Sequence, residues 1–136
     1  MEATNWPAKA SGYKLHCPIG LGSFGLVWKA SCIEGPNKDK NIAIKVIDLE
    51  QFVDNSIDDI RKEIAIMSTC KHPNVITYHV SFIEKTDLWL VMPILGAGSA
   101  ADVIKDKYPM GIKNEAVIAT LLLETLKGLS YFHSNG

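Results

Sequence analysis

The chain has 136 residues, which is about enough for one domain with a hydrophobic core. Hydrophobic residues make up 47% of it and charged residues 21%, as is typical of a globular protein. The formal net charge of -1 argues against a strong electrostatic attraction to nucleic acid or anionic lipid, so we expect neither as a partner.

The cysteines and the apolar segments narrow the class of protein further. Cys17, Cys32 and Cys70 are far apart and form no CxxC pair, so we expect reduced thiols in a cytoplasmic protein rather than disulfides or zinc ligands. The four histidines lack the spacing of metal ligands, and we expect no metal site in this chain. No secretory signal is expected at the start. The longest apolar run, residues 88–95, is too short for membrane insertion.

The first part of the chain is predicted to form strands. Residues 1–12 are expected to be an extended leader. Strands are expected over residues 13–19, 26–32 and 42–49. A glycine-rich turn, residues 20–25, joins the first two strands, and the polar loop 34–40 reverses the chain before the third.

A helix is predicted from Ser56 to about Cys70. Ser56 with Asp59 three positions later approximates a capping box, with Asp in place of Glu. The apolar residues of this segment follow helical spacing: Ile57, Ile60, Ile64 and Met67. The sequence His72-Pro73-Asn74 is expected to end the helix.

The rest of the chain predicts a hairpin and then helices. Strands over 75–83 and 88–92 are joined by the turn 84–87. After the glycine-containing joint 96–98, helices are expected over Ser99–Lys107, capped by Ser99, and over about 114–133. This order predicts an α+β fold, with an antiparallel sheet and one packed helix joined to a helical region.

The glycine turn has the pattern Gly20-x-Gly22-x-x-Gly25, which alone is weak evidence of function. It occurs in dinucleotide-binding folds, where the third glycine opens a helix, and in hairpins that fold over phosphates with their backbone amides. An ordinary glycine-containing hairpin is the third interpretation. The strand-forming residues after Gly25 favour a phosphate-covering hairpin.

Lys45 and Glu63 are the candidate charged pair. Lys45 shares a strand face with the apolar residues Ala43 and Ile47, so it needs solvent or an anionic partner. Glu63 falls beside the apolar stripe of the predicted helix, where an unpaired carboxylate would be costly. A pair between them would place the ammonium near the α- and β-phosphates of a nucleotide. The plainer interpretation is a solvated lysine and a surface carboxylate.

Small apolar residues predict a slot for a flat purine ring between Val27 and Ala43. After Met92, the carbonyl group of Pro93 and the N–H of Leu95 are placed to recognise the adenine edge. Val27, Ala43 and Met92 are equally well interpreted as ordinary core residues.

Together these motifs are far more specific than any one alone. They are the glycine turn from Ile19 to Val27, Ala43-Ile44-Lys45, Glu63, His72-Pro73-Asn74 and Leu90-Val91-Met92. They resemble the small lobe of a protein kinase. The finer pattern, with Trp6-Pro7 and Leu88-Trp89-Leu90-Val91-Met92, is similar to the Ste20-related group that includes the oxidative-stress-responsive and proline-alanine-rich, or Fray-like, serine/threonine kinases.

The resemblance implies a five-stranded antiparallel sheet with one helix, followed by the first helices of the large lobe. It implies a small lobe over residues 13–95 and, over 96–136, the hinge end and a truncated large lobe. The residues implied to contact ATP are Ile19, Gly20, Leu21, Gly22, Ser23, Phe24, Gly25, Val27, Ala43, Lys45, Met92, Pro93 and Leu95. Glu63 is implied to support Lys45, and Met67 and Tyr78 to be packing links between helix and sheet.

Two features depart from parts of the group. Some animal members lack the last glycine of the turn, whereas Gly25 is present here, as in most kinases. Pro93 stands where many kinases have a charged hinge residue. The chain also contains neither a catalytic loop, with its Asp base and Asn metal ligand, nor an Asp-Phe-Gly segment. Mg²⁺ ligands therefore lie outside this sequence, and the chain alone is expected to be inactive.

The leading functional hypothesis is the ATP-binding portion of a serine/threonine kinase that acts on protein hydroxyl groups. The resemblance implies stress or ion-transport signalling and an upstream activating kinase. The alternative is a pseudokinase or scaffold that binds nucleotide or a partner without catalysis. A dinucleotide-dependent oxidoreductase is disfavoured by the strand predicted after Gly25.

Overall fold

The computed structural model describes residues 5–22, 25–51 and 54–135, with residues 54–57 described by their backbone only. The predicted cap at Ser56 therefore lies outside the described side chains. The chain forms two compact units, Met1–Cys70 with Ile76–Ile94, and Lys71–Val75 with Leu95–Gly136.

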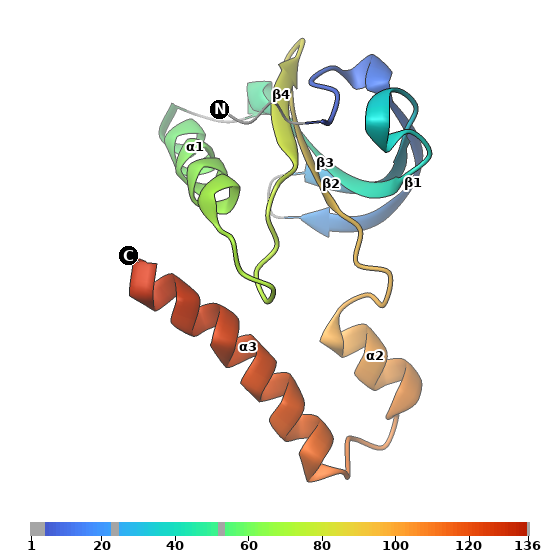
Figure 1. Cartoon of the computed structure of the whole chain (residues 1–136), viewed down its shortest axis with the longest axis vertical. Helices are drawn as coiled ribbons and strands as arrows, with labels where there is room; N and C mark the ends of the chain where they lie inside the picture. Colours follow the sequence, from blue (N-terminus) through green and yellow to red (C-terminus); the bar gives the residue numbers. More distant parts are fainter. Residues whose placement is uncertain (1–4, 23–24, 52–53, 136) are drawn as a thin grey trace. The chain divides into compact units, whose positions relative to one another are not determined.

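The first unit is built on a five-stranded antiparallel sheet in the order β1-β2-β3-β5-β4. Its strands are β1 (Tyr13–Gly22), β2 (Gly25–Cys32), β3 (Asn41–Asp48), β4 (Val80–Glu84) and β5 (Asp87–Pro93). One helix, α1 (Asp54–Thr69), lies beside the sheet (Figure 1). The predicted sheet-plus-helix architecture is confirmed.

The central strand β3 divides the core between two faces of the sheet, because successive side chains of a strand point to opposite sides. Ile42 and Ile44 belong to one buried cluster. Ala43 and Ile47 belong to another, which also contains Ile60 of α1. We call the face that packs on α1 the inner face and the opposite one the outer face.

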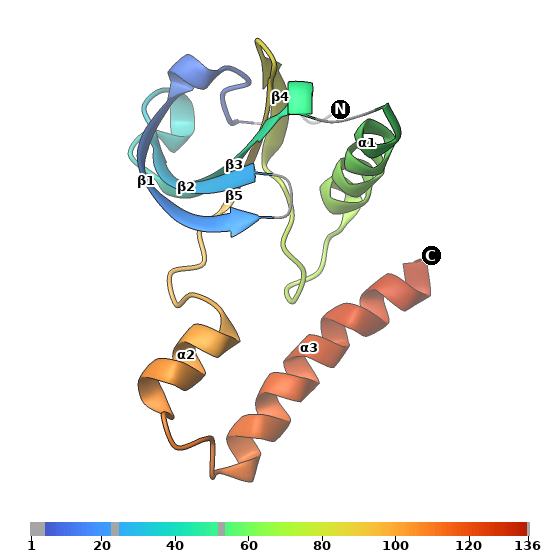
Figure 2. The same ribbon diagram turned by 180° about the vertical axis from the view of Figure 1, so that it is seen from behind.

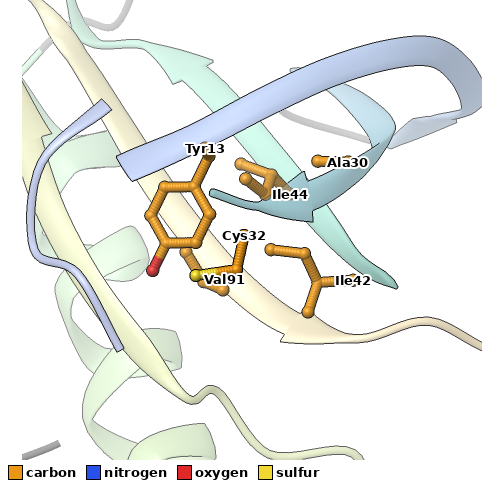
Figure 3. Packing of buried hydrophobic residues seen from close by; sticks show 6 residues of the cluster. All are labelled: Tyr13, Ala30, Cys32, Ile42, Ile44 and Val91. Atoms are coloured by element: carbon orange, nitrogen blue, oxygen red, sulfur yellow. The ribbon is translucent and has the colours of Figure 1, made fainter. Parts of the chain in front are cut away.

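The outer face is closed by apolar and aromatic side chains. Its buried residues, seen in Figure 3, are Tyr13, Ala30, Cys32, Ile42, Ile44 and Val91. Residues of the leader pack over them: Trp6 stacks on His79 with ring centroids 4.5 Å apart. The Tyr13 hydroxyl donates a hydrogen bond to the Pro7 carbonyl oxygen at 2.6 Å. Residues 5–12 are thus held against the sheet and include a short 3₁₀ turn, η1 (Ala10–Gly12), rather than being extended throughout.

Two predicted strand boundaries were wrong. β1 and β2, which lie side by side in Figure 2, continue into the glycine turn, so that Gly22 pairs with Gly25. The predicted strand over 75–83 begins only at Val80. The preceding segment is held by other bonds, including one from the Thr77 side chain to the end of α1.

The second unit contains α2 (Ala100–Lys107) and α3 (Glu115–Asn135), close to the predicted helices. Ser99 caps α2 as predicted: its hydroxyl accepts from the Asp102 amide at 3.0 Å, and the Asp102 carboxylate accepts from the Ser99 amide at 2.8 Å. Among the described residues, no helix combines the length and apolarity needed to cross a bilayer.

Candidate functional site

The three glycines of the turn occupy different surroundings. A Cβ atom added to Gly20 would meet nothing within 4 Å. One added to Gly22 would lie 3.0 Å from Cε and 3.4 Å from Nζ of Lys45. One added to Gly25 would overlap the carbonyl oxygen of Val46. Gly25 is therefore required by the close approach of β2 to β3, and Gly22 leaves room for the lysine side chain.

Lys45 lies at the centre of the sheet, on its inner face. In β3 it pairs with Val27 of β2 and with Leu90 of β5, whose side chain is buried in the inner cluster. Its side chain is half-buried and extends beneath Gly22. The structure therefore brings the Lys45 ammonium close to the glycine turn, residues 20–25, which we call the flap. Both lie on the sheet face that packs on α1.

Glu63 differs from the expectation in its burial. It lies in α1 between Ile60, which is buried, and Met67, which is half-buried, but Glu63 itself is exposed. The cost of an unpaired buried carboxylate therefore does not force it to pair with Lys45, as the sequence argument assumed. Burial of Tyr78, the nearby Glu63 charge and a hydrogen bond with Glu63 raise the pKa of Tyr78 to about 12.

The residues predicted to form the purine slot belong to one cluster. Ala43 and Met92 are buried together on the inner face and pair across β3 and β5, and Val27 packs against the same cluster. Pro93 pairs with Ile42 as the last residue of β5, a position where the missing N–H does not interrupt the sheet. Leu95 belongs to the second unit and is exposed.

Two further predicted site residues lie in β1. Ile19 and Leu21 in β1 expose 49% and 83% of their surface, respectively, so neither is part of the core. Side chains exposed in this way are available to a ligand. Ser23 and Phe24 lie outside the described residues.

Sequence reasoning missed the role of the residues that follow α1. Residues Lys71–Val75 belong to the second unit, where the Asn74 side-chain amide donates to Glu124 of α3 at 2.6 Å. The Lys71 amide donates to the Tyr131 hydroxyl at 3.0 Å, and a Cβ at Gly128 would crowd the Asn74 carbonyl oxygen. Gly128 inside the apolar pattern of α3 was the available signal, because a glycine in a helix often marks a close backbone approach.

The inner face combines a cation with neighbouring glycines and apolar side chains. The Lys45 ammonium group lies close to Gly22 of the glycine turn, on the sheet face that carries the apolar cluster with Ala43 and Met92. A cation and backbone amides are the groups that bind phosphate in kinases, and apolar side chains suit a purine ring. Among the residues that the structure describes, no group of three or more His, Cys, Asp or Glu side chains could hold a metal ion.

The chain matches the protein kinase domain family over residues 13–136. It belongs to this family. The serine/threonine-protein kinases fray2 and fray1 of Dictyostelium discoideum are 46% and 47% identical to it, each over 97% of the chain. Germinal center kinase 3 of Caenorhabditis elegans is 44% identical over 98% of the chain. The resemblance to Ste20-related kinases is therefore confirmed.

These alignments cover only a small part of each relative. The chain spans 12% of fray2, 22% of fray1 and 23% of germinal center kinase 3. It corresponds to the N-terminal part of a protein kinase domain, and kinase domains in general use ATP with Mg²⁺.

Proposed function

We propose that this chain is the ATP-binding portion of a serine/threonine kinase that transfers the γ-phosphoryl group of ATP to protein hydroxyl groups. The observation that carries the proposal is the position of the Lys45 ammonium under Gly22, on the sheet face that packs on α1. The names of the relatives support the same activity.

In this proposal each element of the site has a separate task. The β1–β2 hairpin, including Ser23 and Phe24, covers the phosphates with backbone amides. Lys45 neutralises the α- and β-phosphates, supported by the Glu63 carboxylate. Val27, Ala43 and Met92 enclose the adenine ring, Ile19 and Leu21 cover its edge, and the Pro93 carbonyl and the Leu95 amide bind its polar edge.

The remaining chemistry belongs to groups that this sequence does not contain. Mg²⁺ would neutralise charge on the β- and γ-phosphates, and a carboxylate base would orient the acceptor hydroxyl. We therefore propose that the chain alone binds nucleotide without efficient phosphoryl transfer.

The proposed activity is tested by Lys45→Met in a protein that carries this sequence together with a catalytic loop. We expect phosphotransfer to fall by about 10²-fold or more, because the cation that stabilises the phosphates is lost. Lys14, an exposed lysine of β1, provides a matched control, and Lys14→Met should retain full activity. Equal activity of Lys45→Met and the unsubstituted protein in a purified assay would refute the assigned role.

Binding without catalysis is the alternative, as in a pseudokinase or scaffold. The same assay separates the two, because a pseudokinase would bind ATP in calorimetry and show no turnover even with Lys45 intact. The closeness of Gly22 and Lys45 favours nucleotide binding over a scaffold that binds no nucleotide, because such a scaffold would not need the ammonium beside the glycine turn.

The biological role follows from the resemblance to Fray-like kinases. We propose protein substrates, activation by an upstream kinase, and signalling in stress or ion transport from a cytoplasmic location. We expect phosphorylation of the protein to rise when cells are exposed to osmotic stress. A fall in its phosphorylation, or no change, would contradict this role.

A further inference from the structure

Residues 5–12, which we call the strap, lie ahead of the matched kinase domain, which begins at residue 13. In the described part of the chain, the backbone–backbone hydrogen bonds of residues 5–11 are local: they lie within η1 and reach no further than Tyr13. The strap is therefore not a strand of the sheet. Contacts that involve side chains must hold it against the outer face.

Two side chains of the domain donate hydrogen bonds to alternate carbonyl groups of the strap. The Asn37 side-chain amide donates to the Asn5 carbonyl oxygen at 2.8 Å, and the Tyr13 hydroxyl donates to the Pro7 carbonyl oxygen at 2.6 Å. Both donor residues are buried, and Asn37 is itself fixed by a bond from the Lys40 ammonium to its side-chain oxygen at 2.8 Å. Extended peptides that bind to protein surfaces are also recognised through their backbone groups.

The residue between these two carbonyl groups supplies the apolar contact. Trp6 stacks on the His79 ring, with centroids 4.5 Å apart and planes inclined by 12°, and it packs against the outer cluster. Pro7 lies so close to Gly12 that a Cβ atom there would overlap the proline ring. Bound carbonyl groups on both sides of one aromatic anchor are typical of a peptide-binding site.

The rest of the strap is held weakly. The ion pair of Lys9 with Glu34, 3.1 Å long, joins side chains that are 56% and 41% exposed, so it contributes little. The Ala10 amide reaches the Glu84 carboxylate only at 3.4 Å. The strap therefore depends on a few contacts around Trp6, and a segment with few buried contacts can open locally.

We propose that the outer face carries a binding site for an extended peptide with an aromatic side chain, and that the strap occupies this site as a detachable segment of the same chain. The strap opens and closes as a unit while the sheet stays folded. This inference goes beyond the proposed function and does not depend on it. The alternative is that the strap is a fixed part of the core, which separates only when the whole first unit unfolds.

Cys32 reports on opening, because its thiol lies in the cluster against which Trp6 packs (Figure 3). It is fully buried, whereas Cys17 is exposed and serves as the reference for the reagent. The 136-residue chain is alkylated with iodoacetamide at increasing urea concentrations below the unfolding transition, and the rate at each thiol is followed by mass spectrometry. Local opening exposes little surface, so the Cys32 rate should hardly change over this range. A rate that rises with the full slope of global unfolding would overturn the proposal.

Two variants that destabilise the fold at different places separate the alternatives further. Trp6→Ala removes the anchor of the strap and should speed Cys32 alkylation in the absence of urea about 10-fold or more. Gly25→Ala strains β2 against the Val46 carbonyl oxygen but leaves the contacts of the strap intact, so its Cys32 rate should be nearly unchanged. Equal acceleration in the two variants, or none in Trp6→Ala, would contradict a separately opening strap.

The Asn37 donor is tested by a change that keeps the shape of the side chain. Asn37→Asp removes the N–H groups but keeps an oxygen for the bond from Lys40, so the bond to Asn5 is lost. We expect Cys32 alkylation to become about 5-fold faster. Asn41→Asp makes the same change of charge at an exposed position in β3 and should leave the rate unchanged. Equal rates in the two aspartate variants would contradict the role of the donor.

A synthetic peptide of residues 5–12 tests the binding site itself. Added to the Trp6→Ala chain at about millimolar concentration, which is comparable with the effective concentration of a tethered segment, it should slow Cys32 alkylation several-fold. The same peptide with alanine in place of tryptophan should give no protection, and neither peptide should change the Cys17 rate. Failure of the tryptophan peptide to protect Cys32 would overturn the binding site. None of these readouts requires phosphoryl transfer, so they stand or fall separately from the Lys45→Met assay.

Discussion

The two faces of the sheet differ in the side chains that cover them. The outer face is closed: aromatic rings from the leader and from three strands cover a buried cluster that is mostly apolar. Tyr13 stacks on Phe82 and Phe82 on Trp89, with ring centroids 6.2 Å and 5.8 Å apart. The inner face interrupts its apolar cluster with Lys45 and brings Glu63 and Tyr78 to its edge. Both faces bury apolar residues, and in our proposal the inner face also carries the lysine that binds the nucleotide.

The difference extends to how each face depends on single residues. On the outer face, the loss of one ring removes a share of a large apolar contact. On the inner face, the half-buried Lys45 lies close to Gly22 and beside the apolar cluster. Substitutions on the outer face should therefore change stability, and those on the inner face should change activity.

The largest effect on the fold is expected at Gly25, where the backbone of β2 lies close to that of β3. Gly25→Ala would force a methyl group against the Val46 carbonyl oxygen and should lower the free energy of unfolding by about 1–3 kcal/mol. Gly20→Ala, whose methyl group would lie in open space, should change it little. Chemical denaturation of the two variants checks this pair, and equal losses would contradict the role assigned to Gly25.

A smaller effect is expected from opening the outer face. Trp6→Ala removes the ring that stacks on His79 and part of the cover over the outer cluster. We expect a loss of about 2 kcal/mol in the free energy of unfolding, with an unchanged ATP dissociation constant for the folded protein. Weaker ATP binding by fully folded Trp6→Ala would show that the two faces are not independent.

The smallest effect is a pH dependence of the outer face. Burial and then the charge of Lys40 lower the pKa of His79, so the folded state favours the neutral ring. The unfolded chain binds the proton more tightly, and stability should therefore fall as the pH drops below the ordinary histidine value of 6.5. Melting temperatures at pH 7.5 and pH 5.5 test this. His79→Phe should reduce the difference between them, and an unchanged difference would exclude His79 as its source.

Much of the first unit could be predicted from local patterns. Alternation in β3 placed Ala43, Lys45 and Ile47 on one face, and this holds because neighbouring strands cover both sides of a central strand. The hairpin of β4 and β5 was also found, with Glu84 and Asp87 paired across the turn. Patterns of this kind depend only on residues near one another in sequence.

Contacts between distant residues could not be predicted in the same way. The exposure of Glu63 was missed because a position beside a helical stripe does not say how far the covering sheet extends. The segment before β4 was predicted as strand because Val75 and Ile76 favour strands. Its bonds are instead irregular: the Thr77 side chain donates to the end of α1, and the His79 amide donates to the Val91 carbonyl oxygen of β5. The anchoring of the leader depends on Asn37, a buried side chain that donates to the Asn5 carbonyl oxygen at 2.8 Å.

The most direct test of the central claim is protection of Lys45 by nucleotide. The 136-residue chain is treated with a lysine-acylating reagent, and the labelling rate of each lysine is measured by mass spectrometry. MgATP and MgADP should slow the labelling of Lys45 strongly and leave that of the exposed Lys38 unchanged, whereas adenosine should protect neither. Labelling of Lys45 at the same rate with and without saturating MgATP would contradict the claim that the flap and this ammonium bind the same triphosphate.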